Sequence, residues 1–304
     1  MPHSAQPTYL SLDSKKDAHS IDKNVAPAIR AYLGGSFDPV HVGHLQMAMY
    51  VYQTLLPIAE QQQRMLQVSL LPNARSPFKD ESTDPEHRLT MLKLATQNTP
   101  LQISELELWQ TPPVYTINSV QTLREHYPTD SLIFIMGMDS ARSLDKWKDG
   151  LQLTNYVNLW IFNRDDRANP VATHQEYFDK QSMKQETAFL QAQLPIRLQR
   201  IVADSPSALV ARPTQNTIDN MDLKNSIGLK DSHQGRIYID SRPVIAVSST
   251  QIRQQLAHQM QLTAVQPISA IMSDTASNSS AKWLKPAVYQ YIIARELYSA
   301  AQFR

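Results

Sequence analysis

The sequence of 304 residues contains no cysteine. This absence excludes disulfide bonds, cysteine-ligated zinc, iron–sulfur clusters and thiol catalysis together. Long apolar runs are missing too, because no stretch approaches the ~20 apolar residues of a membrane-spanning helix. The polar segment 1–28 also lacks the apolar run of a signal peptide. We therefore expect a cytoplasmic protein with no membrane partner.

Charge of either sign is scarce. Only 19% of the residues are charged, and 29 Lys and Arg nearly balance 28 Asp and Glu, which gives a net charge of +1. Proteins that bind nucleic acid over a broad surface carry a marked basic excess, so no nucleic-acid partner is expected. An acidic ligand must instead be bound locally, by a few placed groups. The sequence leaves open whether the chain forms a homo-oligomer.

Glycine is the third scarce component. Seven glycines occur in the chain, well below the average of about 7% of residues. Two of them, Gly34 and Gly35, are adjacent. A Gly-Gly pair in such a chain indicates a stretch of backbone that needs glycine.

The remaining composition is that of a globular protein. Hydrophobic residues make up 42% of the chain, which is enough for a sizeable core. Its length fits one large domain or two modest ones at roughly 100–200 residues each. We interpret residues 1–28 as a flexible N-terminal tail and 29–304 as a single domain. Two stretches with weak periodicity, at about 204–233 and 268–280, are expected to be surface insertions.

Strand-like and helix-like segments alternate along the chain. Short apolar runs predict strands at 30–33, 66–71, 101–103, 132–136, 156–162, 237–239 and 244–247. Apolar residues at helical spacing, together with the helix-start pair Asp84-Pro85, predict helices at 44–56, 85–95, 117–127, 250–260 and from about 286. This alternation predicts an α/β fold with a Rossmann-like, doubly wound and mostly parallel sheet. In such sheets ligands bind at the carboxyl ends of the strands.

The strongest chemical motif lies between the first predicted strand and the first predicted helix. It reads Gly34-Gly35-Ser36-Phe37-Asp38-Pro39-Val40-His41-Val42-Gly43-His44. His41 and His44 share one face where a helix begins, and a helix N-terminus favours phosphate through its N–H groups and dipole. Two imidazoles there can donate to phosphate oxygens without a permanent charge. A histidine pair alone is more typical of a capped helix end, whereas the complete string after a strand indicates phosphate chemistry.

Two further segments follow predicted strands. Val247-Ser248-Ser249-Thr250-Gln251-Ile252-Arg253 opens a helix with good N-cap residues, and Arg253 lies one turn in, facing back toward the helix start. Gly137-Met138-Asp139-Ser140 can expose backbone to a flat base and direct a carboxylate at ribose hydroxyls. Taken alone, the first equally fits an ordinary capped helix and the second a plain turn. A parallel sheet would bring the two phosphate-type motifs to one edge.

Together these segments resemble the nucleotidyltransferase superfamily, whose signature is GG(T/S)FDPxHxGH with ISSTxIR and GxDS elements. The resemblance implies that His41 and His44 bind the triphosphate of ATP and stabilise the transition state. It also implies that Arg253 and the helix cap hold the β- and γ-phosphates. The ATP contacts that it assigns are Gly34, Gly35, Ser36, Phe37, Gly137, Asp139, Ser140, Ser248, Ser249 and Thr250.

The order of further segments, from about residue 30 to 300, narrows the resemblance to bacterial nicotinate-nucleotide adenylyltransferases. These segments are Leu71-Pro72-Asn73, Lys79, His87–Leu92, Ser104–Leu108, Tyr115-Thr116, Thr122-Leu123, Trp147 and Arg164. That family makes deamido-NAD from nicotinate mononucleotide and ATP. The resemblance assigns acceptor contacts to Asn73, Thr116, Trp147 and Arg164, with Trp147 stacked on the cationic pyridine ring. Taken alone, Trp147 also fits a partly buried surface aromatic.

The resemblance implies in-line attack by the 5′-phosphate of nicotinate mononucleotide on the α-phosphorus of ATP. His41, His44, Lys79 and Arg253 would neutralise the developing charge. Mg²⁺ would be bound mainly through ATP phosphates, because no carboxylate cluster indicates a dedicated metal site. One departure is Phe78, which stands where the family has a histidine and cannot donate a hydrogen bond.

Alternatives of two classes remain at this stage. The first is an adenylyltransferase for phosphopantetheine or another small phosphate, including nicotinamide mononucleotide. The Tyr115-Thr116 segment, Trp147 and the chain length argue against phosphopantetheine. The second is an ATP-binding regulatory module without turnover, against which the intact His41, His44 and Arg253 argue.

Overall fold

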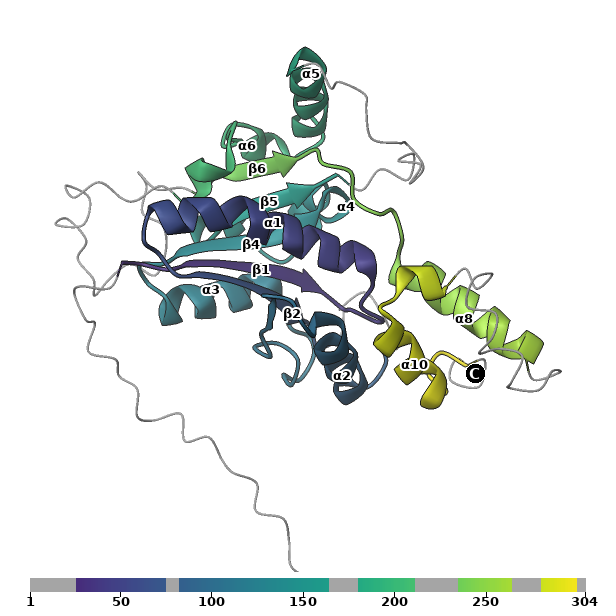
Figure 1. The fold of residues 1–304 in the computed structure, drawn as a ribbon. Coiled ribbons are helices and arrows are strands. Elements are labelled where there is room, and N and C mark those ends of the chain that lie inside the picture. Colours follow the sequence, from purple (N-terminus) through teal and green to yellow (C-terminus); the bar gives the residue numbers. More distant parts are fainter. Residues whose placement is uncertain (1–25, 75–81, 164–179, 211–234, 264–279, 300–304) are drawn as a thin grey trace, which may run out of the picture.

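The computed structural model describes residues 26–74, 82–163, 180–210, 235–263 and 280–299. Within these ranges six strands form one sheet in the order β3-β2-β1-β4-β5-β6, and every pair is parallel (Figure 1). The strands are β1 Ile29–Gly35, β2 Leu66–Pro72, β3 Gln102–Ile103, β4 Ser131–Gly137, β5 Asn158–Phe162 and β6 Ile237–Asp240.

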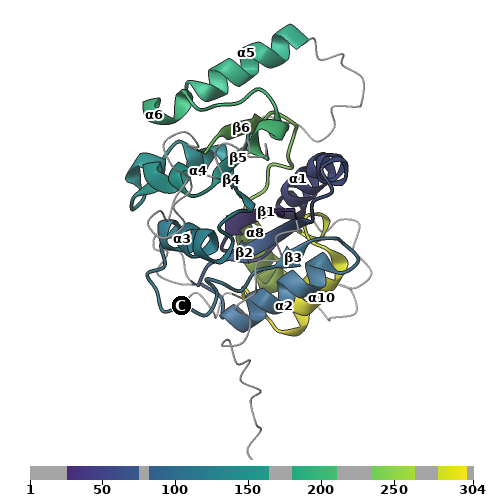
Figure 2. The same cartoon turned by 90° about the vertical axis from the view of Figure 1, so that its left-hand side faces the viewer.

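Helices lie on both faces of this sheet (Figures 1 and 2). The α-helices are α1 Val42–Gln61, α2 Pro85–Thr96, α3 Thr116–His126, α4 Met138–Ala141, α5 Lys180–Gln191, α6 Ile196–Gln199, α8 Ser249–Thr263 and α10 Pro286–Ala294. The 3-10 helices are η1 Leu144–Lys146, η2 Gly150–Asn155, η3 Pro206–Leu209 and η4 Ala281–Trp283. The layered arrangement confirms the predicted doubly wound α/β fold.

Two hydrophobic clusters, one on each face, account for this layering. Because successive strand residues point to opposite faces, Ala31 and Leu33 of β1 pack with α1, α2, α8 and α10, while Tyr32 between them packs with α3. β1 and β4 are buried along most of their length, as strands covered on both faces must be. The near-continuous apolar runs that predicted these strands reflect this double burial.

The strand order reverses between β1 and β4. The helix that follows β1 is α1, which packs in one cluster, whereas α4, which follows β4, packs in the other. Helices therefore diverge from the carboxyl ends of β1 and β4 and leave a crevice there. Ligands of open α/β sheets bind at such a switch point.

One predicted strand is wrong. The segment Val244–Val247 has no ladder partner, and the N–H of Ile245 donates instead to the Gln46 side-chain oxygen of α1, at 2.8 Å. Its apolar character has another cause, because Val244 and Val247 are buried in the core. The helices α5, α6 and η3 lie between residues 163 and 236, where the sequence pattern predicted no element.

The helix start predicted at Asp84 is confirmed. Pro85 is the first residue of α2, and Asp84 Oδ1 accepts a hydrogen bond from the Glu86 N–H at 2.7 Å. The predicted tail 1–28 lies outside the described residues up to residue 25, and Ala28 is already buried. Residues 211–233 and 268–279 of the predicted insertions lie outside them as well.

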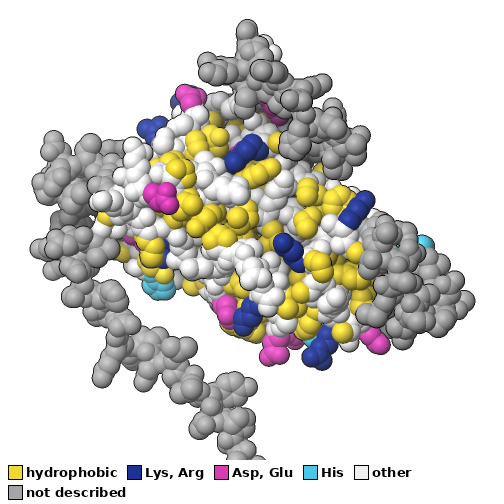
Figure 3. Space-filling model, viewed as in Figure 1, with side chains coloured by type: hydrophobic (Ala, Val, Ile, Leu, Met, Phe, Trp, Pro, Cys, Tyr) yellow, Lys and Arg dark blue, Asp and Glu magenta, His cyan; other side chains and the backbone are white. Residues whose placement is uncertain are grey.

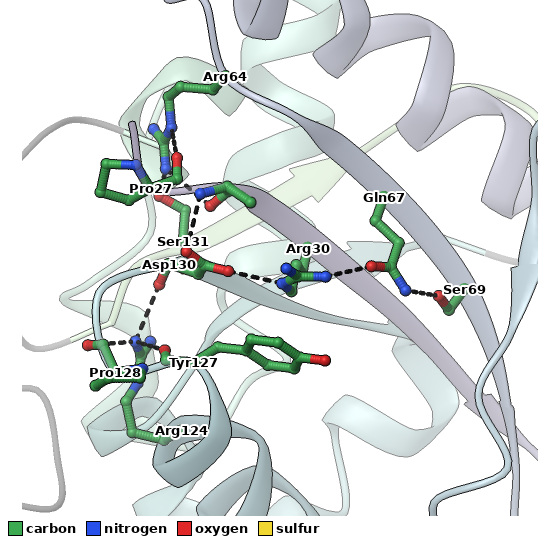
Figure 4. A network of polar contacts seen from close by, with 11 residues as sticks. Pro27, Arg30, Arg64, Gln67, Ser69, Arg124, Tyr127, Pro128, Asp130 and Ser131 are labelled. Atoms are coloured by element: carbon green, nitrogen blue, oxygen red, sulfur yellow. Dashed lines mark hydrogen bonds and ion pairs between the residues drawn. The ribbon is translucent and has the colours of Figure 1, made fainter. Parts of the chain in front are cut away.

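Arginine side chains join the starts of the strands at the amino edge of the sheet (Figure 4). Arg30 forms an ion pair with Asp130 at 2.6 Å. Arg64 donates to the carbonyls of Pro27 and Ala28, which precede β1, and to Ser131 Oγ at 2.6 Å. These contacts tie the end of α1 to the starts of β1 and β4.

Arg124 closes the same edge from α3. Its buried guanidinium donates to the carbonyl of Tyr156 at 2.8 Å and 3.0 Å, and to those of Tyr127, Pro128 and Asp130 at 3.1 Å, 3.2 Å and 2.9 Å. Burial lowers the pKa of this arginine to about 10. The cost of desolvating the charge is offset by saturating the guanidinium with main-chain acceptors, since buried carbonyls require donors.

We predict that Arg124→Met lowers the free energy of unfolding by roughly 3 kcal/mol, because it leaves buried carbonyls without a donor. Urea denaturation followed by circular dichroism measures the change. Arg200→Met is the control, since Arg200 is exposed, and it should change stability by no more than about 0.5 kcal/mol. Equal effects of the two substitutions would show that the carbonyl contacts do not stabilise the fold.

Candidate active site

A cavity of about 900 Å³ opens at the carboxyl ends of β1 and β4. Its wall contains most of the predicted site residues, namely Gly34, Gly35, Ser36, His41, His44, Asn73, Thr116, Gly137, Asp139, Ser140, Trp147, Ser248, Ser249 and Thr250. Phe37 and Arg253 lie outside this wall, and Lys79 and Arg164 lie outside the described residues. Segments from five parts of the chain therefore converge on one cavity, of a size that can hold two small ligands.

The two glycines at the end of β1 allow aromatic rings to approach the backbone. A Cβ on Gly34 would lie 2.5 Å from Cζ of Phe134, and one on Gly35 would lie 3.3 Å from Cζ of Phe37. Phe37 is fully buried with a positive φ of 48°, and its ring meets His44 edge-on at 4.9 Å. Phe37 thus supports the histidine from behind.

The two histidines open helix α1. His41 is the N-cap residue, and its ring stacks on that of His44 with 3.6 Å between centroids and 26° between planes. The His41 backbone N–H donates to Nδ1 of His44 at 3.3 Å, so a neutral His44 carries its proton on Nε2. Both rings are largely buried and line the cavity. The pair is placed to donate hydrogen bonds to an anion at the helix N-terminus.

Gly43 makes room for a second segment of the chain. A Cβ there would lie 2.9 Å from the carbonyl oxygen of Ile245 and 3.2 Å from Nδ1 of His41. Ile245 is also bonded to Gln46, one residue beyond the first turn of α1. The absent side chain at Gly43 therefore lets segment 244–247 lie directly on the start of α1.

This packing brings the start of α8 beside the start of α1. Ser248 Oγ accepts from the Gln251 N–H at 3.1 Å, as expected of an N-cap residue. Ser249 Oγ donates to the Pro39 carbonyl at 2.9 Å. Arg253 is half-buried, and its Nη1 donates to the Asp38 carbonyl at 2.6 Å. The structure thus bonds the second motif directly to the first and places Arg253 beside the wall residue Thr250, to whose hydroxyl its Nη2 donates at 3.4 Å.

Arg88 holds the loops of this edge together, a role that sequence reasoning missed. Its fully buried guanidinium donates to the carbonyls of Thr83 at 3.0 Å, Ser36 at 2.9 Å and Asn73 at 2.7 Å, and to that of Ala74. Burial lowers the pKa of Arg88, and the nearby Asp38 carboxylate opposes that shift. The only sequence signal was its place in the His87–Leu92 segment, which matched the family pattern without indicating a role.

Trp147 lies half-buried on the cavity wall, in a turn that depends on Gly150. A Cβ on Gly150 would lie 2.1 Å from the Leu144 carbonyl oxygen and 2.8 Å from the Trp147 Cβ. Asp149, just before it, has a positive φ of 49°. The tight turn fixes where the Trp147 ring stands. Near it, Lys148 Nζ lies 4.6 Å from the centroid of the Tyr115 ring.

Glu107 is a second residue of the cavity wall to which sequence reasoning gave no role. Its side chain is buried, and burial raises the pKa of the carboxyl group, while the Ser119 hydroxyl partly opposes the shift. The adjoining wall residues Tyr115 and Thr116 stand at the start of α3. Its sequence segment, Ser104–Leu108, matched the family pattern, but burial of the carboxyl group leaves no trace in the residue order.

Within the described ranges, no group of three His, Asp or Glu side chains is arranged to hold a metal ion. None of the helices described combines the length and apolar character that crossing a bilayer requires.

Comparison with known proteins agrees with this geometry. The Cytidylyltransferase-like family model matches residues 32–255. A relative from Psychromonas ingrahamii, called a probable nicotinate-nucleotide adenylyltransferase, is 31% identical over 242 residues, which are 79% of this chain and 91% of the relative. The nicotinate-nucleotide adenylyltransferase of Bacillus subtilis is 38% identical over 130 residues, which are 41% of this chain and 64% of the relative.

A solved structure shows the same fold. The Plasmodium falciparum nicotinic acid mononucleotide adenylyltransferase complexed with NaAD superposes with a TM-score of 0.52 at 17% identity, over 89% of this chain and 97% of that chain. The match covers 91% of the Psychromonas ingrahamii relative, and the region matched by the family model contains both helix-start motifs and the cavity between them. The chain therefore belongs to the cytidylyltransferase-like family and, within it, to the nicotinate-nucleotide adenylyltransferases.

Proposed function

We propose that the chain transfers the adenylyl group of ATP to nicotinate mononucleotide, which gives deamido-NAD and pyrophosphate in NAD biosynthesis. One observation carries this proposal: the N-termini of α1 and α8 and the Trp147 ring all face a single cavity of about 900 Å³. The helix starts suit a triphosphate and the ring suits a flat acceptor. The names of the sequence relatives support the same substrates.

The reaction needs no nucleophile from the protein. A 5′-phosphate oxygen of the acceptor forms a bond to the α-phosphorus of ATP, and the bond from that phosphorus to the bridging oxygen of pyrophosphate breaks. The protein contributes positioning and stabilisation of charge. His41, His44 and the start of α8 would bind the phosphates, with Lys79 and Arg253 as further cations. Mg²⁺ would supply charge neutralisation while bound mainly through ATP phosphate oxygens.

The adenosine is proposed to lie at the end of β4. Gly137 ends this strand, and Asp139 and Ser140 begin the short helix α4 on the cavity wall. Exposed backbone at Gly137 can contact a flat base, and the Asp139 carboxylate can accept from ribose hydroxyls. Gly34 and Gly35 lie at the neighbouring end of β1, where the backbone of the wall has no side chains.

The acceptor is proposed to lie between Trp147 and Thr116. Asn73 lines the same cavity, and its Oδ1 atom is buried and accepts no hydrogen bond from the described residues. A buried amide oxygen of this kind is suited to a ligand donor. Arg164 is proposed as a further acceptor contact from the resemblance alone. Cytoplasmic location and the absence of a nucleic-acid partner stay predictions.

Pyrophosphate release tests this function. We expect rapid release from Mg-ATP with nicotinate mononucleotide, and much slower release with nicotinamide mononucleotide or phosphopantetheine. A ratio of kcat/KM that favours the amide would contradict the substrate assignment. Preference for phosphopantetheine would also overturn the role of Trp147. Measurable ATP binding without release for any acceptor would favour a regulatory module.

Gly150→Ala tests the placement of Trp147. The added Cβ clashes with the Leu144 carbonyl and the Trp147 Cβ, so the ring must move. We expect the KM for nicotinate mononucleotide to rise roughly tenfold, with the KM for ATP nearly unchanged. Gly235→Ala is the control, because its Cβ would lie 2.3 Å from the Val157 carbonyl oxygen but Gly235 does not line the cavity. A rise of both KM values in Gly150→Ala would contradict the assignment of Trp147 to the acceptor.

Glu107→Gln tests the state of the buried carboxyl group. The stability that protonated Glu107 contributes is fully present below the ordinary pKa of glutamate and is lost as pH rises through the raised folded-state pKa. We therefore expect the variant and the parent to have similar free energies of unfolding at about pH 4, and the variant to be more stable at about pH 7.5. Urea titrations at both pH values measure this. Glu105→Gln is the control, since Glu105 is exposed, and it should show no such gain at neutral pH.

A further inference from the structure

Near the end of the described residues, the side chain of Tyr298 reaches the first motif. Tyr298 follows α10, has no exposed surface and adopts a positive φ of 65°. Its hydroxyl donates to Oδ1 of Asp38 at 2.7 Å, across 260 residues of sequence. Burial and the neighbouring Asp38 carboxylate raise the pKa of Tyr298 well above its ordinary value, so the hydroxyl stays a donor at working pH.

Asp38 is a junction of three segments. Its carboxylate accepts from Tyr298 through Oδ1 and from the Thr83 N–H, just before α2, through Oδ2 at 3.3 Å. Its main-chain carbonyl accepts from Arg253 of α8 at 2.6 Å. The residue is 4% exposed, so its carboxylate and its carbonyl depend on these protein donors. The side chain and the carbonyl of one residue thus connect the C-terminal segment to the helix that carries the second motif.

The Tyr298 contact also decides which group of Asp38 meets Arg253. A carboxylate attracts a guanidinium more strongly than a carbonyl does. With Tyr298 and Thr83 bonded to the two carboxylate oxygens, Arg253 bonds the carbonyl instead. Loss of the hydroxyl would leave the buried carboxylate, among the described residues, with the Thr83 N–H at 3.3 Å as its hydrogen-bond donor. The nearby Arg88 guanidinium directs its N–H groups to carbonyls, so a direct Asp38–Arg253 ion pair would become favourable. Such a pair would hold the arginine away from phosphate.

We infer that Tyr298 is a positioning residue of the adenylyl transfer, which acts through Asp38 to hold the first motif and to keep Arg253 available to the substrate phosphates. The inference rests on the proposed function for its kinetic readout. A purely structural role would make Tyr298 one more buried aromatic, and its loss would lower stability without a specific effect on Arg253.

Tyr291 offers a matched control. It lies in α10, and its hydroxyl also makes a partly buried hydrogen bond of 2.7 Å, with Nδ1 of His87 in α2. This contact joins α10 to α2 but does not reach the first motif. Tyr291→Phe and Tyr298→Phe each remove one hydroxyl and keep the ring, so they separate loss of a hydrogen bond in general from loss of the Asp38 contact.

The test is a double-mutant cycle of Tyr298→Phe and Arg253→Ala, measured as kcat and as the KM for each substrate. We expect Tyr298→Phe to lower kcat about tenfold and to leave the KM for nicotinate mononucleotide nearly unchanged. Tyr291→Phe should lower kcat less than about twofold. In the Arg253→Ala background Tyr298→Phe should lower kcat by a clearly smaller factor than in the parent, because one of its two targets, Arg253, is already absent. Multiplicative losses in the double variant would overturn the inference, as would equal kcat values for the two tyrosine variants.

Hydrogen–deuterium exchange supplies a readout that does not depend on activity. Amides of residues 34–44 should exchange faster in Tyr298→Phe than in Tyr291→Phe, after the exchange rates are corrected for any difference in overall stability between the two variants. Unchanged exchange in Tyr298→Phe would overturn the inference. If the unsubstituted protein released no pyrophosphate with any acceptor, the proposed function would fail, while the exchange comparison would still decide whether Tyr298 fixes the first motif.

Discussion

The carboxyl edge of the sheet depends on one buried cation, the guanidinium of Arg88. Its N–H groups meet carbonyl oxygens in the loop after β1, in the loop after β2 and in the segment before α2. A buried charge costs free energy unless its donors are used, and here the acceptors are main-chain carbonyls that need donors themselves. The geometry of the cavity wall follows, because the Ser36 and Asn73 backbones on its two sides share this one side chain.

The amino edge uses the same device. Arg64 and Arg124 donate to carbonyls around the starts of β1 and β4 (Figure 4), and Arg124 also donates to the Tyr156 carbonyl before β5. In a chain with few charges, arginines are thus placed where loops converge and main-chain acceptors accumulate. Figure 3 shows a face on which charged side chains are dispersed among apolar and neutral ones. Because the sheet is fixed at both edges, the strand ends and the helix starts that follow them keep the same positions relative to one another.

Local patterns in the sequence predicted the sheet and the helix starts on the cavity wall, whereas Asn73, Thr116 and Trp147 of the wall were predicted only through the family resemblance. Double burial gives strands an apolar run, and helix starts after strands give capped motifs. Segment 244–247 was misassigned because its apolar residues are buried while its N–H bonds a side chain of α1. The roles of Arg88, Glu107 and Tyr298 were not predictable, since a bond to a distant carbonyl or carboxylate, or burial in a wall, leaves no periodicity or spacing. Lys79 and Arg164 lie outside the described residues and stay predictions.

A nearly neutral chain that is proposed to bind two anionic substrates must control its own carboxylates as well as supply cations. Asp38 is buried beside the phosphate motifs, yet it is bonded to a neutral hydroxyl and a backbone N–H. Because the hydroxyl and the N–H bond the two carboxylate oxygens, Arg253 donates to the Asp38 carbonyl and its charge is not neutralised by a direct ion pair with this carboxylate. The negative charge of Glu107 on the cavity wall is disfavoured as well, because burial raises the pKa of its carboxyl group and favours the neutral acid. Local treatment of single carboxylates therefore makes an anion site without a basic surface.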